Sequence, residues 1–421
     1  MDQRSSRRGT PWAPPEATPS APLVDATILE FGQVIAGNYA GALLADLGAT
    51  VIKVESPDGD PARNPAIAGI DGQSAIHLTV NRGKQSVVID LKTDEGRAVF
   101  YRLVATADAV LDNFRPGVLE RLGIGHATLR AHNPRIISAS VTGYGNHGPD
   151  RDRPAFDLVV QAVSGHMSIT GEPDRPPARV GIPLADLAAG LFTCVSVLAA
   201  LLDRERTGRG RRIDVSMLDC MVSLLTYDAT IFLNTGKQLP RSGSAHAHMV
   251  PWQAFRTADG YITVTAREEK FWRRLCEALG RLDLIDDPRA RSNEARVANR
   301  AWVTAQLEQA LAGRSTASWM EVFARYDLPA GPVNDFEHLF GEPHVVARNL
   351  VHAYNDPSSG EVRYVRSPAE IGGWAYPRLR PPRLGEHTVA VLRDRLGMGE
   401  AEIGDLLDGR AVVDGAGAPT A

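Results

Sequence analysis

The sequence is poor in cysteine, with three in 421 residues. Cys194, Cys220 and Cys276 are far apart and form no Cys-x-x-Cys pair and no cysteine–histidine cluster. This spacing indicates neither a zinc site nor a disulfide framework. We interpret the three residues as buried small apolar side chains in a reducing compartment, and we expect a cytoplasmic protein without a metal site.

The chain also lacks a strong net charge. It carries 46 Lys and Arg against 50 Asp and Glu, which gives a formal net charge of −4. No basic field results, so the sequence argues against a nucleic-acid partner. The charge-free apolar run at 187–202 is shorter than the roughly 20 residues of a membrane span, so we expect no membrane partner.

Three further signatures are missing. Residues 1–22 are rich in Pro, Ser and Arg and have no apolar signal core, so we expect a disordered leader. The glycines of GQVIAGNYAG (32–41) do not follow G-x-G-x-x-G, which argues against a dehydrogenase. His246 and His248 lie two apart, but no third metal ligand or catalytic triad accompanies them.

The chain does contain an alternation of strand-like and helix-like segments over residues 27–145. TILEF, TVIKVE, KQSVVIDL, DAVLDN and RIISASV read as strands, and amphipathic segments such as DEGRAVFYRLVATAD separate several of them. This alternation predicts an α/β fold with a parallel sheet and helices on both faces. A mainly helical stretch follows, a new unit begins near 240, and the chain past 340 is extended and rich in Pro and Arg.

Several loops at predicted strand ends carry polar and cationic residues. Lys84 lies in NRGKQS, and LDNFRPGVLERLG supplies Asn113, Phe114, Arg115 and Arg121. Ligands of open α/β sheets bind at the carboxyl ends of the strands. An aromatic face, an amide and several cations there suit adenine and phosphate groups, although each cation alone is compatible with an ordinary surface charge.

Asp186 is the single ionisable residue of VGIPLADLAAGLF (180–192). One interpretation makes it the N-cap of a helix that begins at Leu187, where its side chain would accept hydrogen bonds from backbone N–H groups. The other makes it a covalent nucleophile, held at a helix start beside small residues that leave room for a ligand. The segment alone leaves both interpretations open.

Taken together, nine segments resemble the class III coenzyme A transferases, a family that includes the formyl-CoA and crotonobetainyl-CoA:carnitine transferases and the α-methylacyl-CoA racemases. They occur in family order over about residues 27–390. The segments are ILEFGQVIAGNYAGALLADLGATVIKVE, NRGKQSVVIDLK, LDNFRPGVLERLG, PRIISASVTGYG, FDLVVQAVSGHMSITGEP, GIPLADLAAGLF, LLDRERTGRGRRIDVSMLD, DLPAGPV and LGEHT.

The resemblance implies a fold and a set of site residues. It implies a Rossmann-like large domain from 23–225 and 340–421, a smaller α+β domain at 226–339, and an interlocked homodimer. Asp186 falls on the catalytic aspartate of the family. The positions that line the coenzyme A (CoA) site correspond to Val34, Ala36, Lys84, Asn113, Phe114, Arg121, Tyr144 and Gly145.

The sequence departs from the family pattern at informative positions. Asn38 stands where many members have proline. Ile35 and Gly145 replace a glutamine and a glutamate of the formate/oxalate enzyme, so that enzyme's chemistry is not carried over. The racemases have a His-Asp dipeptide where this chain has Phe156-Asp157, which argues against racemase activity because the second acid–base group is missing.

From this resemblance we expect an acyl-CoA:carboxylate CoA-transferase. It would move CoA from a donor such as succinyl-CoA to a small (di)carboxylic acid through an aspartyl-CoA thioester at Asp186. The CoA thioester is then a substrate, and no cofactor is permanently bound. His166 is the candidate for binding a second carboxylate of the acceptor. The alternatives are a racemase-like isomerase and a non-catalytic CoA-binding protein.

Overall fold

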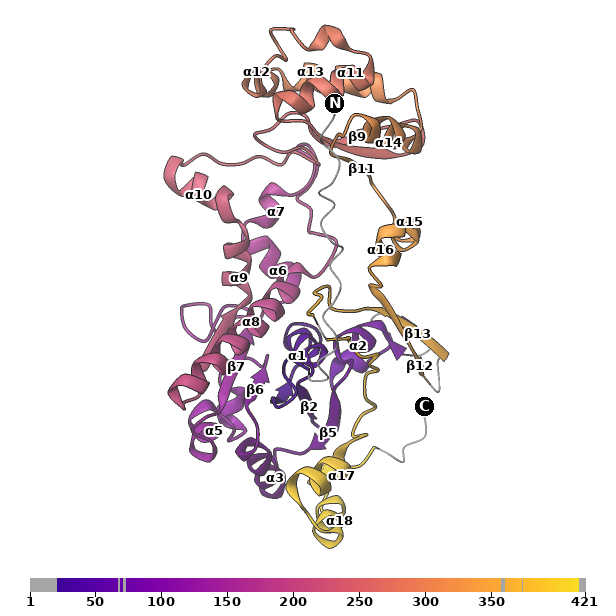
Figure 1. Cartoon of the computed structure of the whole chain (residues 1–421). Helices are drawn as coiled ribbons and strands as arrows, with labels where there is room; N and C mark the ends of the chain where they lie inside the picture. The colour runs from indigo at the N-terminus through magenta and orange to yellow at the C-terminus, as the bar shows by residue number, and fades with distance from the viewer. Residues whose placement is uncertain (1–20, 67–68, 71–72, 357–359, 373, 416–421) are drawn as a thin grey trace. The chain divides into compact units, whose positions relative to one another are not determined.

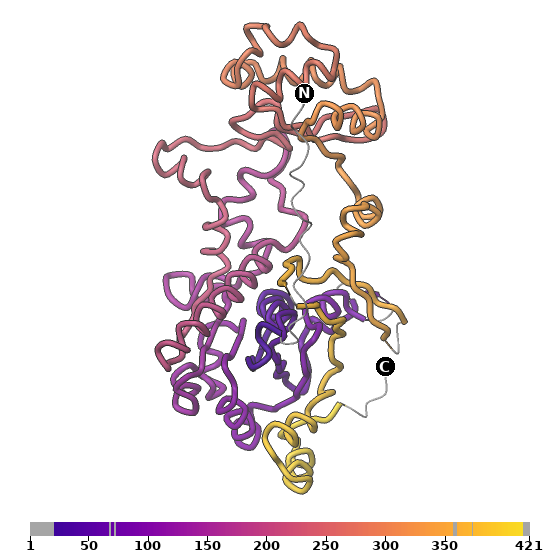
Figure 2. The backbone as a smooth tube through the Cα atoms, viewed as in Figure 1, coloured from indigo at the N-terminus to yellow at the C-terminus, as the bar shows by residue number. Residues whose placement is uncertain are grey.

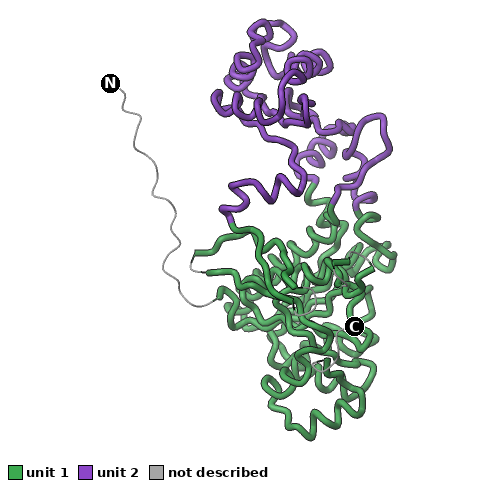
Figure 3. Tube along the Cα trace, turned by 90° about the vertical axis from the view of Figure 1, so that its right-hand side faces the viewer, with its two compact units in different colours: residues 1–160, 182–224, 349–421 green, residues 161–181, 225–348 purple. Residues whose placement is uncertain are grey.

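The computed structural model describes residues 21–66, 69–70, 73–356, 360–372 and 374–415 (Figure 1). Most of the leader predicted at 1–22 lies outside the described residues. The chain divides into two compact units (Figure 3). The first comprises Met1–Val160, Ile182–Leu224 and Asn349–Ala421, and the second comprises Gln161–Gly181 and Leu225–Arg348.

The first unit is built on a seven-stranded sheet in the order β14-β5-β2-β1-β6-β7-β8. Every neighbouring pair is parallel except β14 and β5. Counted along the chain, the six parallel strands follow the order 3-2-1-4-5-6 of dinucleotide-binding folds, which confirms the α/β prediction. The strands are β1 (Thr27–Phe31), β2 (Thr50–Glu55), β5 (Gln85–Ile89), β6 (Ala109–Asp112), β7 (Ile137–Thr142), β8 (Arg212–Ser216) and β14 (Val412–Val413).

The side chains of β1 show how the sheet is covered on both faces. All five of its residues are buried, as expected of a central parallel strand. Ile28 joins a core with residues of α1 (Ala36–Asp46) and α8 (Leu184–Thr207). Leu29 joins the opposite core with residues of α3 (Asp94–Ala105) and α5 (His126–His132). Neighbouring strand residues point to opposite faces, so one strand supports both helical layers.

The C-terminal segment returns to this unit. The backbone of His387 donates to the carbonyl of Ser86, and β14 pairs with β5. Figure 2 shows this yellow segment beside the purple chain of β5. Residues about 300 positions apart in sequence therefore complete one edge of the sheet, as the resemblance implies for a large domain built from both chain ends.

The second unit has its own core, in which Phe255, Trp272 and Phe323 are almost fully buried. An antiparallel sheet, β9 (Trp252–Arg256), β10 (Tyr261–Thr265) and β11 (Ala330–Pro332), packs with α11 (Glu269–Leu279), α12 (Asn293–Ala298), α13 (Arg300–Leu311) and α14 (Thr316–Arg325). The predicted small domain, 226–339, did not include 161–181 and ended before 340–348. The structure groups both segments with this unit, and the N–H of Gly243 donates to the carbonyl of Gly171.

The other helices and strands of the described residues complete the two units. They are η1 (Pro61–Arg63), β3 (Gly69–Ile70), β4 (Gln73–Ser74), α2 (Ala75–Val80), α4 (Val118–Arg121), α6 (Asp157–Val163), α7 (His166–Ile169), α9 (Met217–Leu224), α10 (Thr226–Thr235), η2 (Leu282–Leu284), α15 (Phe336–Gly341), α16 (Pro343–Ala347), β12 (Val351–Asp356), β13 (Gly360–Val365), α17 (Thr388–Ala390), the π-helical turn η3 (Val391–Arg395) and α18 (Glu400–Asp408).

Helix α8 is the longest helix of the first unit. By length and composition alone its 24 residues could cross a membrane, but 44% of its apolar window is buried inside the protein. It packs on α1 at Gly190, where an added Cβ would lie 2.9 Å from the carbonyl oxygen of Ala36 and 2.9 Å from the Tyr39 ring. Only glycine allows this close approach of the two helices.

Gly190→Ala should therefore destabilise the first unit by about 1–3 kcal/mol, because the new methyl group must push α8 away from backbone atoms of α1. The midpoint of urea unfolding measures this change. Gly404 in α18 is the matched control, since nothing lies within 4 Å of its added Cβ. Gly404→Ala should stabilise by about 0.5–1 kcal/mol, and equal shifts in the two variants would contradict the close packing.

Candidate active site

Two pockets lie at the carboxyl ends of β1, β2 and β6. The order of the sheet reverses at β1, which pairs with β2 on one side and β6 on the other. Ligands bind at such switch points. An amide exchange joins the loops that follow β1 and β6: the N–H of Gln33 donates to Asn113 Oδ1 at 2.7 Å, and Asn113 Nδ2 donates to the carbonyl of Gln33 at 2.8 Å.

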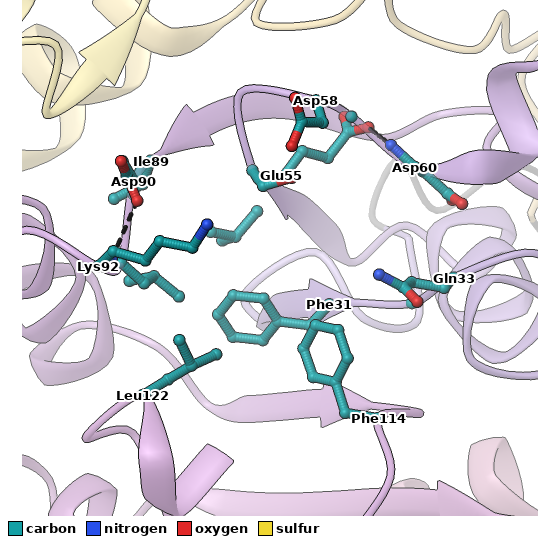
Figure 4. A pocket seen from close by; sticks show the side chains of 15 residues that line it. Phe31, Gln33, Glu55, Asp58, Asp60, Ile89, Asp90, Lys92, Phe114 and Leu122 are labelled. Carbon is teal, nitrogen blue, oxygen red and sulfur yellow. Dashed lines mark hydrogen bonds between the residues drawn. The ribbon is translucent and has the colours of Figure 1, made fainter. Parts of the chain in front are cut away.

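The first pocket, here named the β2-side pocket, has a volume of about 270 Å³ (Figure 4). The rings of Phe31 and Phe114 lie 6.1 Å apart and form one wall. Four carboxylates and one ammonium group also line it. The lining residues are Phe31, Gly32, Gln33, Val54, Glu55, Ser56, Asp58, Gly59, Asp60, Ile89, Asp90, Leu91, Lys92, Phe114 and Leu122.

The second pocket, here named the Asp186 pocket, has a volume of about 340 Å³. It shares Gln33 and Phe114 with the β2-side pocket, so one ligand could extend through both. Asp186 is the one carboxylate that lines it, against three guanidinium groups. The lining residues are Gln33, Val34, Ile35, Ala36, Asn113, Phe114, Arg115, Pro116, Val118, Val141, Thr142, Gly143, Arg151, Arg153, Ala155, Phe156, Asp186 and Met217.

Asp186 lies in the first turn of α8 and is not its N-cap. The helix begins at Leu184, so the sequence placed its start three residues too late. Pro183 is the N-cap residue and makes no side-chain hydrogen bond. Instead, the N–H of Ala185 donates to Asp157 Oδ1 at 2.7 Å. Because Asp157 satisfies this first-turn N–H group, the carboxylate of Asp186 is left to face the pocket.

The environment of Asp186 makes its ionisation unfavourable. Burial, and to a smaller degree the negative charge of Asp157, raise the pKa of Asp186 from 3.8 to about 7. Burial among apolar groups disfavours a charged carboxylate, and a second carboxylate adds repulsion. A carboxylate that loses its hydration in this way is a stronger nucleophile, and shifts of this size favour a functional site.

The structure brings only part of the predicted CoA-lining set to these pockets. Val34, Ala36, Asn113 and Phe114 all line the Asp186 pocket. Lys84 lines neither pocket, because its buried ammonium group pairs with Glu30 at 2.5 Å and donates to the carbonyl of Asn38 at 2.8 Å. Burial lowers the pKa of Lys84 to about 8, and Glu30 opposes that shift. Arg121, at the end of α4, also lines neither pocket.

The predicted residues after β7 lie beside the pocket wall. Thr142 and Gly143 line the Asp186 pocket, whereas Tyr144 and Gly145 do not. The hydroxyl of Tyr144 is buried and has no hydrogen-bond partner among the described residues. The guanidinium group of Arg153 lies 5.7 Å from the centre of the Tyr144 ring.

His166 belongs to the second unit, in α7. Its Nδ1 lies 3.2 Å from Ser164 Oγ, and burial lowers its pKa, which keeps the ring neutral near pH 7. His246 and His248 belong to the same unit. Within the described part of the chain, no group of three His, Cys, Asp or Glu side chains could hold a metal ion.

Sequence reasoning missed two cations of the Asp186 pocket, Arg151 and Arg153. They lie in RDRPAF, between β7 and α6, where each contacts an aspartate of the same loop: Arg151 with Asp152 at 3.1 Å, and Arg153 with Asp150 at 3.6 Å. The sequence does show a pair of arginines shortly after a strand end. The neighbouring aspartates made this segment resemble an ordinary solvated loop.

Comparison with known proteins gives one consistent family. A family model described as CoA-transferase family III matches residues 23–388. The succinate–glutarate CoA-transferase of Agrobacterium fabrum is 37% identical over 381 residues, which are 89% of this chain and 95% of that protein. The acetyl-CoA:oxalate CoA-transferase of Acetobacter aceti is 37% identical over 382 residues, which are 90% of this chain and 97% of that protein.

Solved structures agree with this result. The crystal structure of a CaiB/BaiF family protein from Brucella suis superimposes with a TM-score of 0.80 at 36% sequence identity. The match covers 89% of this chain and 99% of that one.

The pKa of Asp186 predicts how stability depends on pH. In the unfolded chain this carboxyl group loses its proton from about pH 4 upward, whereas the folded protein keeps the proton until about pH 7. The ionised group therefore costs stability above this window. Asp186→Asn should stabilise the protein by about 4 kcal/mol near pH 8 and by almost nothing near pH 4, measured by thermal unfolding.

Asp203 is the matched control for this measurement. Hydrogen bonds from Arg206 and Arg211 lower its pKa, so Asp203→Asn should give no gain in stability at alkaline pH. An equal gain in stability for Asp186→Asn at both ends of the pH range would contradict an Asp186 whose ionised form destabilises the folded protein.

Proposed function

The chain belongs to CoA-transferase family III and is a CoA-transferase, and from this premise we propose that Asp186 carries CoA as a covalent thioester between donor and acceptor. One observation carries the proposal. A carboxylate whose pKa is raised by burial is the only acidic group that lines the Asp186 pocket, among the residues described. The named relatives support CoA transfer as the reaction.

The two pockets suit the two ends of a CoA thioester. In the β2-side pocket, Phe31 and Phe114 offer flat apolar faces for a base, and Asp58 and Asp90 offer acceptors for amino and hydroxyl groups. We therefore place the adenosine end there. The pantetheine arm then passes Gln33, which lines both pockets, and brings the thioester to Asp186. Arg115 lines this second pocket and is placed to bind a phosphate group.

The reaction then proceeds in four steps at Asp186. Its carboxylate attacks the thioester carbonyl of the donor and forms a mixed anhydride, while the carbon–sulfur bond breaks and CoA leaves as a thiolate. The thiolate attacks the side-chain carbonyl of Asp186, which gives the aspartyl-CoA thioester and releases the donor acid. The acceptor carboxylate attacks this thioester, and the thiolate leaves again. It finally attacks the acceptor carbonyl and frees Asp186.

The surroundings of Asp186 favour these steps. The thioester bond energy is kept throughout, so the carboxylate needs only to be reactive and protected from water. Its neighbours along α8 include Ala185, Ala188, Ala189 and Gly190, and all four are buried. Small apolar neighbours leave room for the thioester and provide few partners for water, which protects the anhydride and thioester from hydrolysis.

We propose a small dicarboxylate as the acceptor and succinyl-CoA as a donor. Glutarate and oxalate, which give two relatives their names, are both dicarboxylates. The second carboxylate of such an acceptor needs a cation. His166 was the candidate from sequence, but its lowered pKa leaves it neutral. Arg151 and Arg153 line the same pocket as Asp186 and stay charged, so we place the second carboxylate against them.

We also propose that a second copy of the chain completes the enzyme as the interlocked homodimer that the resemblance implies. Helix α8 exposes apolar side chains that a partner would cover: Leu191 is 49% exposed, Val195 61% and Leu202 76%. The cytoplasmic location expected from the sequence stays a prediction.

Hydroxylamine trapping tests the covalent intermediate. Incubation with succinyl-CoA followed by hydroxylamine should leave a hydroxamate on Asp186, found by peptide mass spectrometry, because a thioester or anhydride at that side chain reacts with the amine. Asp186→Asn should still bind CoA but lose transfer activity by about 1,000-fold or more. Binding of CoA by the wild type with no adduct, for several acyl-CoA donors, would favour the non-catalytic or isomerase alternatives.

Acceptor kinetics test the role of the arginines. Arg153→Met should raise the KM for glutarate by about 10-fold or more and leave the KM for a monocarboxylate such as butyrate within about twofold. Arg115→Met is the matched control. It should raise the KM for the CoA donor and not discriminate between the two acids. An Arg153→Met variant that weakens both acids equally would contradict recognition of the second carboxylate.

A further inference from the structure

Val34 has a backbone conformation that valine rarely adopts. Its φ angle is 57°, in the left-handed region, and its branched side chain makes that conformation costly. Such a residue stores about 1–3 kcal/mol of strain and persists only where its surroundings enforce it. Val34 lines the Asp186 pocket, so the strained turn forms part of the wall that a thioester would contact.

Asp60, in the loop after β2, holds the strained turn. Its Oδ1 accepts hydrogen bonds from the N–H of Val34 at 3.1 Å and from the N–H of Ala62 at 2.8 Å. Its Oδ2 accepts from Asn38 Nδ2 at 2.7 Å and pairs with Lys53 Nζ at 2.9 Å. Burial opposes ionisation of Asp60, but the Lys53 ammonium group and these N–H donors lower its pKa to about 2.

Lys53 also holds this loop through hydrogen bonds. Its ammonium group is wholly buried and donates to the carbonyl of Gly32 at 2.7 Å and to Asn38 Oδ1 at 2.7 Å. Asn38 Nδ2 also donates to the carbonyl of Val34 at 3.1 Å. The loop from Gly32 to Ala36 is thus fastened at the Gly32 carbonyl and at both backbone polar groups of Val34.

This arrangement lowers the stability of the folded protein. Glu30, Lys53, Asp60 and Lys84 bring four ionisable side chains into the interior, each no more than 5% exposed. Buried ion pairs contribute little net stability compared with apolar residues of similar size, because desolvation offsets their attraction. The loop is also tight, since a Cβ on Gly32 would lie 2.4 Å from Asn38 Oδ1. A charged cluster that holds a strained residue against a pocket points to function.

We propose that Asp60 and Asn38, anchored by Lys53, are positioning residues for CoA transfer: they hold Val34 in its left-handed conformation and so fix the pocket wall against which the thioester lies before Asp186. This inference rests on the proposed role of Asp186. When the hydrogen bonds that join Asp60 and Asn38 to Val34 are lost, Val34 relaxes toward negative φ and the loop from Gly32 to Ala36 moves. The thioester is then bound less accurately, and kcat falls.

A rescue experiment tests this proposal. Asp60→Asn should lower kcat by about 10-fold or more, since small displacements from the reactive geometry are costly. Asn38→Ala should act in the same direction and leaves the charge of Asp60 in place. Glycine adopts positive φ without strain, so adding Val34→Gly to Asp60→Asn should recover at least about threefold of the lost kcat.

Asp46→Asn is the matched control, because Asp46 is a buried carboxylate that pairs with buried Arg82 and lines neither pocket. It should lower the urea midpoint and leave kcat unchanged. An unchanged kcat in Asp60→Asn and Asn38→Ala would overturn the proposal, and so would a loss that Val34→Gly does not relieve. Absence of the Asp186 adduct in the wild type would instead overturn the proposed function, so the two failures are distinguishable.

Discussion

The chemistry proposed for this protein depends on keeping the carboxylate of Asp186 poorly hydrated. A hydrated carboxylate is a weak nucleophile, and a buried one is both destabilised and reactive. The fold meets this condition through α8, whose small residues pack against α1 and whose first turn places Asp186 in the pocket at the switch point of the sheet. Asp157 takes over the capping of Ala185, so the hydrogen-bonding capacity of Asp186 is not spent on the helix.

Two features of the site therefore lower the stability of the folded protein. The ionised form of Asp186 is unfavourable in the folded protein, and Val34 is held in a strained conformation by buried charges. Natural proteins tolerate such costs where activity requires them. The apolar core formed by both faces of the sheet supplies the compensating stability, with residues such as Ile28 and Leu29 wholly buried on opposite faces.

Much of the fold could be predicted from the sequence, because the alternation of strands and helices is a local pattern. The resemblance singled out Asp186 as the catalytic aspartate; the structure places it in a pocket wall, and its role in catalysis stays a proposal. Contacts between distant segments could not be predicted. The sequence does not show that Lys84 pairs with Glu30, that Arg151 faces the pocket, or that 161–181 joins the second unit. The start of α8 was misplaced because Asp186 resembles an N-cap residue, whereas Pro183 holds that position in the structure.

A single turnover with an acceptor whose carboxylate carries isotopically heavy oxygen tests the central claim most directly. In the proposed reaction an acceptor oxygen bridges to the Asp186 carbonyl, and the final attack of the thiolate leaves that oxygen on the aspartate. With both oxygens of the reacting carboxylate labelled, the account predicts one heavy oxygen in the peptide that contains Asp186 and one in the thioester carbonyl of the product. Both heavy oxygens lost to water, or an Asp186 peptide without label after product has formed, would contradict it.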